Sequence, residues 1–231
     1  FLRAVRAILY YAMKLNYLED FKIELLKEEK KIKETYTDSE LKILLEKPDV
    51  TECNFPEFRN WAMINFLIAT GARLRTVRNI KITDLDFENN YIQFTTVKNR
   101  RQQIVPMSKR LADVLLDYLK YRKGEPDDYL FPTMYENKFT TSGMHSAIKR
   151  YCKRRGVTKH SIHLFRHTFA KKWILNDGDI FRLKQVLGHS SLEMVKEYVN
   201  MFNEDLKKDF EKFNPLDQLS SRGNYIDMNS K

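Results

Sequence analysis

Apolar positions recur at helical spacing along most of the chain. In residues 1–18 they lie three or four positions apart, which predicts one amphipathic helix. Residues 57–70 are apolar on nearly every side and run up to Gly71, as in a buried helix that stops at a glycine. Two short β-type runs, 91–97 and 102–107, flank a cationic tip and predict a small hairpin.

Polar residues mark the starts of further helices. Thr37 and Glu40 have the spacing of a capping box before an apolar run, so a compact domain is expected to begin near Tyr36. Another helix is expected from Ser108 to about Arg122. Further starts are predicted at Ser161, Asp179 and Ser190, and stops at Gly156 and Gly188. The fold is therefore expected to be mainly α with a small antiparallel β-hairpin, in the α+β class.

The same pattern divides the chain into four parts. Residues 1–20 begin inside an apolar-periodic segment and are expected to be the last helix of a truncated module. Residues 21–36 alternate in charge without a sustained apolar face, which favours a linker. Residues 37–205 are expected to form the compact domain, and residues 206–231 a tail that docks on a neighbouring subunit.

Composition excludes several classes of protein. The chain has 231 residues, 42% hydrophobic and 31% charged, and lacks an apolar run near the roughly 18 residues of a membrane-spanning helix. A membrane partner is therefore not expected. Cys53 and Cys152 stand outside any CxxC motif, which argues against a disulfide scaffold or a zinc module and fits a reducing cytoplasm. Neither a metal nor a cofactor is expected.

The net charge of +10 is concentrated in one block. Residues 137–176 contain every Lys and Arg of the excess and no Asp or Glu. A block of this kind, interleaved with aromatic side chains and histidines, is typical of a phosphate-backbone partner, whereas a solvated helix face usually mixes both signs. The cations expected to contact nucleic acid, here and at the hairpin tip, are Arg100, Arg101, Lys149, Arg150, Lys153, Arg154, Arg155 and Lys159.

Residues with candidate chemistry lie at the starts, stops and turns of the expected elements, where side chains can converge on a site. They are Arg73, Lys98, His163, Arg166, His189 and Tyr198. Taken singly, each has an ordinary explanation: a salt bridge at a helix end, a solvated lysine, a capping histidine, the turn of a helix-turn-helix, or a half-buried helix tyrosine. Only the combination is informative.

Together these residues resemble the tyrosine recombinase, or phage integrase, family. The family order of Arg, Lys, His-x-x-Arg, His or Trp, and Tyr is filled by TGAR (70–73), Lys98, HLFRH (163–167), LGHSS (187–191) and Tyr198. The resemblance covers roughly residues 37–202. It implies the tyrosine recombinase catalytic-domain fold, with residues 1–20 as the end of the family's helical core-binding domain.

The resemblance also implies a metal-independent cleavage and rejoining of DNA strands. Arg73 and Arg166 would clamp the scissile phosphate, since planar guanidinium groups match two phosphate oxygens. Tyr198 would be the nucleophile that forms a covalent 3′-phosphotyrosine. The other implied roles are a general acid for the departing 5′ oxygen at Lys98, an acid/base partner for the tyrosine at His163, and a contact to the transition-state phosphate at His189.

The implied partners are double-stranded DNA with a recombination site, further copies of the chain in a tetramer on two duplexes, and an accessory directionality factor. The implied setting is the cytoplasm of a bacterium, on the nucleoid, where the protein integrates or excises a phage or mobile element. Two rivals stay open: a type IB topoisomerase, which uses a similar residue set, and a non-catalytic helix-turn-helix module. The compact spacing favours the recombinase, and the complete residue set argues against a pure binder.

Overall fold

The fold is described from a computed structural model, which covers residues 2–24, 34–95, 103–189, 191 and 195. Contacts divide the chain into two units, residues 1–32 and residues 33–231. In the first unit α1 (Leu2–Lys14) forms the amphipathic helix that the spacing predicts. Within this unit the backbone N–H of Ile23 donates to the hydroxyl of Tyr10 (3.3 Å).

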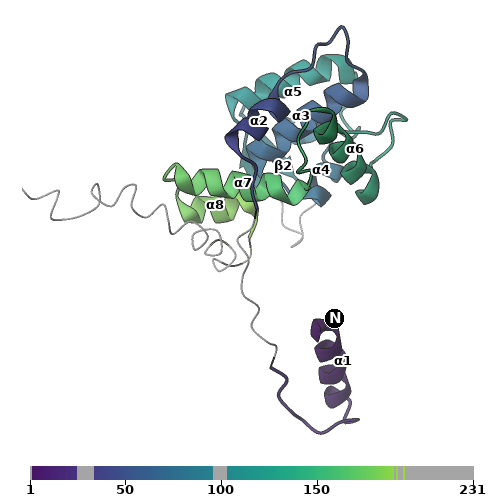
Figure 1. Cartoon of the computed structure of the whole chain (residues 1–231), viewed down its shortest axis with the longest axis vertical. Helices are drawn as coiled ribbons and strands as arrows, with labels where there is room; N and C mark the ends of the chain where they lie inside the picture. The colour runs from purple at the N-terminus through teal and green to yellow at the C-terminus, as the bar shows by residue number, and fades with distance from the viewer. Residues whose placement is uncertain (1, 25–33, 96–102, 190, 192–194, 196–231) are drawn as a thin grey trace, which may run out of the picture. The chain divides into compact units, whose positions relative to one another are not determined.

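The second unit is mainly helical (Figure 1). Its elements in chain order are α2 (Asp38–Leu45), α3 (Phe55–Thr70), α4 (Leu74–Asn79), the 3₁₀ turn η1 (Ile82–Asp84), β1 (Leu85–Asp86), β2 (Tyr91–Phe94), β3 (Gln103–Pro106), α5 (Lys109–Arg122), α6 (Thr141–Arg154), α7 (Ile162–Leu175) and α8 (Ile180–Leu187). Among the described residues no helix combines the length and the apolar character needed to cross a membrane.

Helix α3 is the centre of the core, as its nearly continuous apolar sequence predicts. It packs against α2, α5, α6 and α7, and Phe66 and Leu67 on it are fully buried. Burying a side chain of this size stabilises the fold by about 1.5–3 kcal/mol. The helix begins two residues before the expected start because the Asn54 side chain accepts from the N–H of Glu57 (3.0 Å). It stops at Gly71, which has φ +59°.

The three strands form an antiparallel sheet in the order β1-β2-β3. The predicted hairpin is β2 and β3, with Ile92 opposite Val105 and Phe94 opposite Gln103. Strand β1 adds an edge that the sequence pattern does not predict, because two residues show no periodicity. A mainly helical unit with a small antiparallel sheet confirms the expected fold class.

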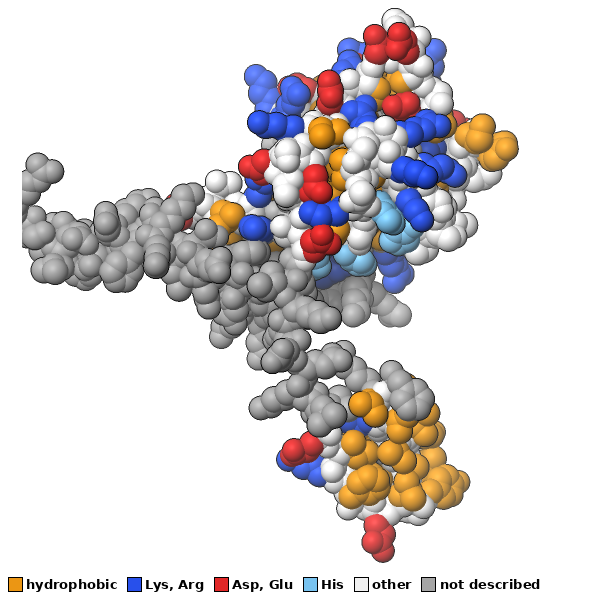
Figure 2. All heavy atoms as spheres, viewed as in Figure 1, with side chains coloured by type: hydrophobic (Ala, Val, Ile, Leu, Met, Phe, Trp, Pro, Cys, Tyr) orange, Lys and Arg blue, Asp and Glu red, His pale blue; other side chains and the backbone are white. Residues whose placement is uncertain are grey.

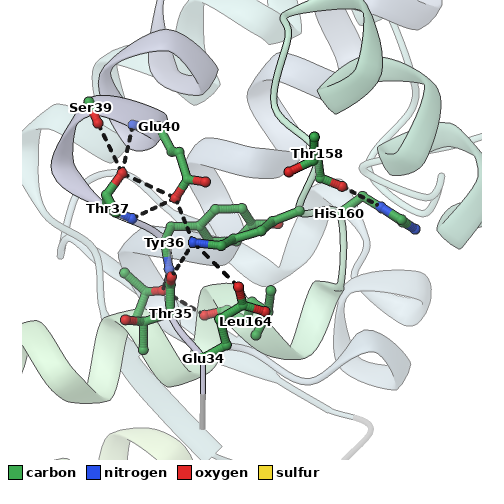
Figure 3. Close-up of polar contacts among 11 residues, drawn as sticks. Glu34, Thr35, Tyr36, Thr37, Ser39, Glu40, Thr158, His160 and Leu164 are labelled. Atoms are coloured by element: carbon green, nitrogen blue, oxygen red, sulfur yellow. Dashed lines mark hydrogen bonds and ion pairs between the residues drawn. The ribbon is translucent and has the colours of Figure 1, made fainter.

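The segment before α2 is packed on α7 (Figure 3). Tyr36, which falls in the predicted linker, is 3% exposed and stacks on Phe165 of α7 with ring centroids 4.4 Å apart. Its backbone N–H donates to Oγ1 of Thr168 (2.9 Å). The predicted capping box is also present, with Thr37 and Glu40 exchanging their side-chain and backbone hydrogen bonds. The start of the domain is therefore attached to the helix that carries His163 and Arg166.

Candidate active site

The site is built around the turn that ends α8. Asp179 caps the start of this helix by accepting from the N–H of Arg182 (2.8 Å), and Gly188 ends it with φ +60°. Both signals were predicted from the sequence. His189 follows at once, is 7% exposed, and donates its backbone N–H to the carbonyl of Lys184 (3.1 Å). The backbone of the turn thus fixes where His189 lies.

Arg166 joins this turn to the end of α3. It lies on α7, is 7% exposed, and donates from Nη1 to the carbonyl of Gly71 (2.8 Å) and from Nη2 to the carbonyl of Leu187 (2.7 Å). Gly71 is needed here because a Cβ on it would lie 2.8 Å from both Leu187 and Phe169. Two charge-assisted hydrogen bonds to buried carbonyls fix the plane of the guanidinium group.

Arg73, two residues after Gly71 in the chain, binds the same turn. It is the N-cap residue of α4, is half-buried, and donates from Nη2 to the carbonyl of Gly188 (3.1 Å). Arg73 and Arg166 come from different elements and bind consecutive carbonyls, those of Gly188 and Leu187. The structure therefore brings together the two arginines that the sequence singled out.

A further side chain, which the sequence pattern did not single out, binds the same turn. Gln103, the first residue of β3, donates from Nε2 to the carbonyls of Gln185 (2.8 Å) and Val186 (2.7 Å). A glutamine at a strand start gives no sequence signal for such a contact. It links the sheet to the end of α8.

The other candidate residues are placed as follows. His163, the second residue of α7, is exposed, and Arg166 follows three positions later on the same helix. Lys98, Arg100, Arg101 and Tyr198 lie outside the described residues. The described strands that flank Lys98 end at Phe94 and begin at Gln103.

The basic block divides into exposed and engaged cations. Figure 2 shows Lys, Arg and His side chains gathered over the part of the second unit that Figure 1 labels α6. Lys149, Arg150 and Lys153 of α6 are exposed. Arg154 is also exposed and lies 3.8 Å from the carboxylate of Glu57.

Two cations of the block bind other parts of the protein. Arg155 donates to the carbonyl of Ile43 (2.8 Å) and lies over the ring of Tyr151. Lys159 has a side chain only 20% exposed, and its Nζ lies 3.1 Å from both the carbonyl of Thr35 and Oε2 of Glu40. Burial raises the pKa of Glu40, but the N–H of Thr37 and the ammonium of Lys159 outweigh it and lower that pKa. These two cations therefore hold the segment before α2, and α2 itself, in place.

The described residues hold no group of three or more His, Cys, Asp and Glu side chains arranged for a metal ion. The chemistry of the part described here is that of cationic donors: guanidinium groups around one helix end, a buried histidine beside them and an exposed histidine on α7. Donors of this kind stabilise an anion that gains charge during a reaction.

Comparison with known proteins shows to which family the chain belongs. Residues 34–205 match the sequence profile of the Phage integrase family. The chain belongs to the phage integrase family, the tyrosine recombinases. It is 28% identical over 166 residues to a tyrosine recombinase of Pseudothermotoga lettingae, covering 71% of this chain and 55% of the relative. It is 25% identical over 224 residues to the tyrosine recombinase XerD of Staphylococcus epidermidis, covering 93% of this chain and 75% of the relative. The chain thus spans little more than half of the first relative.

Solved recombinase structures have the same fold. The XerA recombinase superimposes with a TM-score of 0.67 at 26% identity, covering 92% of this chain and 74% of that one. The Tn1549 transposon integrase, solved with circular intermediate DNA, has a TM-score of 0.68 at 20% identity and covers 89% of this chain and 77% of that one. These neighbours confirm the tyrosine recombinase fold that the motifs implied.

Proposed function

We propose that this tyrosine recombinase cleaves and rejoins DNA strands at a specific site through a covalent 3′-phosphotyrosine on Tyr198. The observation that carries the proposal is the convergence of Arg73 and Arg166 on consecutive carbonyls of one turn, next to buried His189. An in-line attack on a phosphodiester builds charge on the non-bridging oxygens, and fixed guanidinium donors stabilise that charge.

The proposed step conserves the energy of the phosphodiester bond. The hydroxyl oxygen of Tyr198 attacks phosphorus, the bond from phosphorus to the 5′ oxygen breaks, and Lys98 gives that oxygen a proton. His163 takes the tyrosine proton, and His189 contacts the phosphate in the transition state. A 5′ hydroxyl of another strand then attacks the phosphotyrosine and releases the tyrosine, so strands are exchanged without an external energy source.

The proposed partners follow from the same reaction. Double-stranded DNA supplies the phosphate. The cations proposed to hold its backbone are the exposed Lys149, Arg150, Lys153 and Arg154 of α6, with Arg100 and Arg101. Exchange between two duplexes requires several active sites, which supports a tetramer with docking by residues 206–231 and control by an accessory factor. The Tn1549 transposon integrase supports a mobile-element or phage role, and the bacterial relatives support a bacterial cytoplasm and nucleoid.

A nicked suicide duplex distinguishes the proposal from its two rivals. Loss of the short fragment next to the nick traps a covalent intermediate, so the full chain is incubated with a pool of nicked duplexes whose flanking sequence is randomised. A non-catalytic binder forms no adduct. A topoisomerase forms an adduct but only relaxes supercoiled plasmid, whereas the proposed enzyme also joins strands of two different duplexes; adducts without any joining contradict the recombinase.

Binding to duplex DNA is expected to weaken steeply with salt. Each phosphate neutralised by a lysine or arginine contributes about −0.9 to the slope of log K against log salt concentration. Four exposed cations on α6 and its end therefore predict a slope near −3 to −4 from this face alone. Fluorescence anisotropy with a labelled duplex between about 50 and 200 mM salt measures it. A slope near zero contradicts the assignment of this face to DNA.

Two lysines of the basic block are expected to respond in opposite ways to the same substitution. Lys153→Met removes an exposed cation, so the slope of log K against log salt should become less steep by about 0.9. The free energy of unfolding should stay within about 0.5 kcal/mol of the wild-type value. Lys159→Met removes the contacts to Thr35 and Glu40, so it should lower the free energy of unfolding by about 1–2 kcal/mol and leave the slope unchanged. Denaturant unfolding and anisotropy measure both; the reverse pattern contradicts these assignments.

A further inference from the structure

The end of α8 depends on donors from outside the helix. An α-helix leaves its last four carbonyl groups without intrahelical partners. Here the backbone N–H groups of Gly188 and His189 donate to Gln185 (3.0 Å) and Lys184 (3.1 Å). The carbonyl of Val186 and the two that follow it receive side-chain donors instead. The position of the turn is therefore set by the side chains that bind it.

Gln103 is the neutral member of this set of donors. Its Nε2 binds the carbonyls of Gln185 and Val186, while Arg166 and Arg73 bind the next two carbonyls along the chain. Three side chains from β3, α7 and the start of α4 thus meet along one run of four carbonyls. Arg73 and Arg166 belong to the proposed clamp, and Gln103 has no role in it.

Gln103 also packs tightly against the turn. A Cβ built on Gly188 would lie 2.6 Å from Oε1 of Gln103, and φ of Gly188 is +60°. The amide therefore lies directly over the glycine that ends the helix, and a side chain at 188 would push it away. The contact is made between the sheet and α8, which lie next to each other in the unit.

We propose that Gln103 is a positioning residue for DNA cleavage: its carboxamide caps α8 and fixes the turn that binds both arginines and carries His189. This rests on the proposed function. Catalytic donors act on developing phosphate charge only when they are held in place, and a displacement of about 1 Å can cost about 100-fold in rate. Without the amide, the carbonyl of Val186 loses this donor and, of the three side chains, only the two arginines still bind the turn.

Three substitutions separate capping from packing. Gln103→Met keeps the length and has no donor, Gln103→Glu keeps the shape but puts a carboxylate against two carbonyls, and Gln103→Arg keeps donors for them. Gln93→Met, on the half-buried neighbouring strand β2, is the matched control.

We expect single-turnover adduct formation on the nicked pool to fall about 10- to 100-fold for Gln103→Met and Gln103→Glu, and to stay within about 3-fold of the wild-type rate for Gln103→Arg and the control. The Kd for duplex DNA should stay within about 3-fold for Gln103→Met and Gln93→Met, because neither substitution changes a charge and the affinity rests mainly on cation–phosphate contacts.

Amide hydrogen exchange tests the cap independently of activity. In Gln103→Met the amides of Gly188 and His189 should exchange at least about 10-fold faster, with those of α5 unchanged, whereas Gln103→Arg should retain their protection. Cleavage by Gln103→Met at the wild-type rate overturns the inference, as does a loss of rate with unchanged protection of the two amides. If the wild-type chain itself forms no adduct, that result contradicts the proposed function and not the capping role of Gln103.

Discussion

Replacing Arg166 by lysine should lower the single-turnover rate of DNA cleavage by about 100- to 1,000-fold. Lysine keeps the positive charge but loses the planar pair of donors that holds Gly71 and Leu187, and with it the geometry proposed for the phosphate clamp. Arg166→Ala should in addition lower the free energy of unfolding by about 2–4 kcal/mol, because it leaves two buried carbonyls without their donor. Single-turnover adduct formation and denaturant unfolding measure the two effects separately.

The control for charge is Arg110→Lys and Arg110→Ala on the exposed start of α5. Both should leave the rate within about 2-fold and the free energy of unfolding within about 0.5 kcal/mol. An Arg166→Lys variant that cleaves at the rate of the wild-type chain contradicts the role of Arg166 in the clamp. An Arg166→Ala variant as stable as the wild type contradicts its role in holding the turn.

Local signals predicted most of the helices. The capping box of Thr37 and Glu40, the cap at Asp179 and the glycine stops at Gly71 and Gly188 are all present. These signals work because each cap is satisfied within three or four residues of chain. Ser161 occupies its predicted cap position without a side-chain capping bond. Ser190, a further predicted helix start, and the tail lie outside the described residues.

Contacts between distant parts of the chain were not predictable in the same way. The charge pattern groups Lys159 with its cationic neighbours, yet it binds Thr35 and Glu40, more than a hundred positions away. The contacts of Gln103 with Gln185 and Val186 span 82 and 83 positions of the sequence. Charge counts and periodicity hold no information about such pairs, because only the packing of the helices brings them together.

The arginines show what the order of motifs adds to the interpretation of single residues. Arg73 alone could be a salt bridge at a helix end, and it does lie at the start of α4. The role proposed for Arg73 rests on the turn that it shares with Arg166, and the order of motifs anticipated that the two would meet. The sequence could not show that the two guanidinium groups bind backbone carbonyls, which fixes their positions in the protein.

Substitution of Tyr198, the proposed nucleophile, has the largest expected effect of all. Tyr198→Phe removes only the hydroxyl oxygen that forms the bond to phosphorus, so covalent adduct formation should fall below detection, a loss of more than about 10,000-fold. Binding to duplex DNA should be unchanged within about 2-fold, because the substitution leaves the basic face of α6 intact. Tyr225→Phe is the matched control: it makes the same change at a second tyrosine of the C-terminal part.

The most direct test of the account is denaturing gel analysis of protein and 5′-labelled DNA after reaction with the nicked duplex pool. The wild-type chain and Tyr225→Phe should each give a protein-linked DNA band, and peptide mapping should place the DNA on Tyr198. Tyr198→Phe should give no such band. Adducts retained by Tyr198→Phe, or mapped to another residue, contradict the assignment of the nucleophile and with it the proposed reaction.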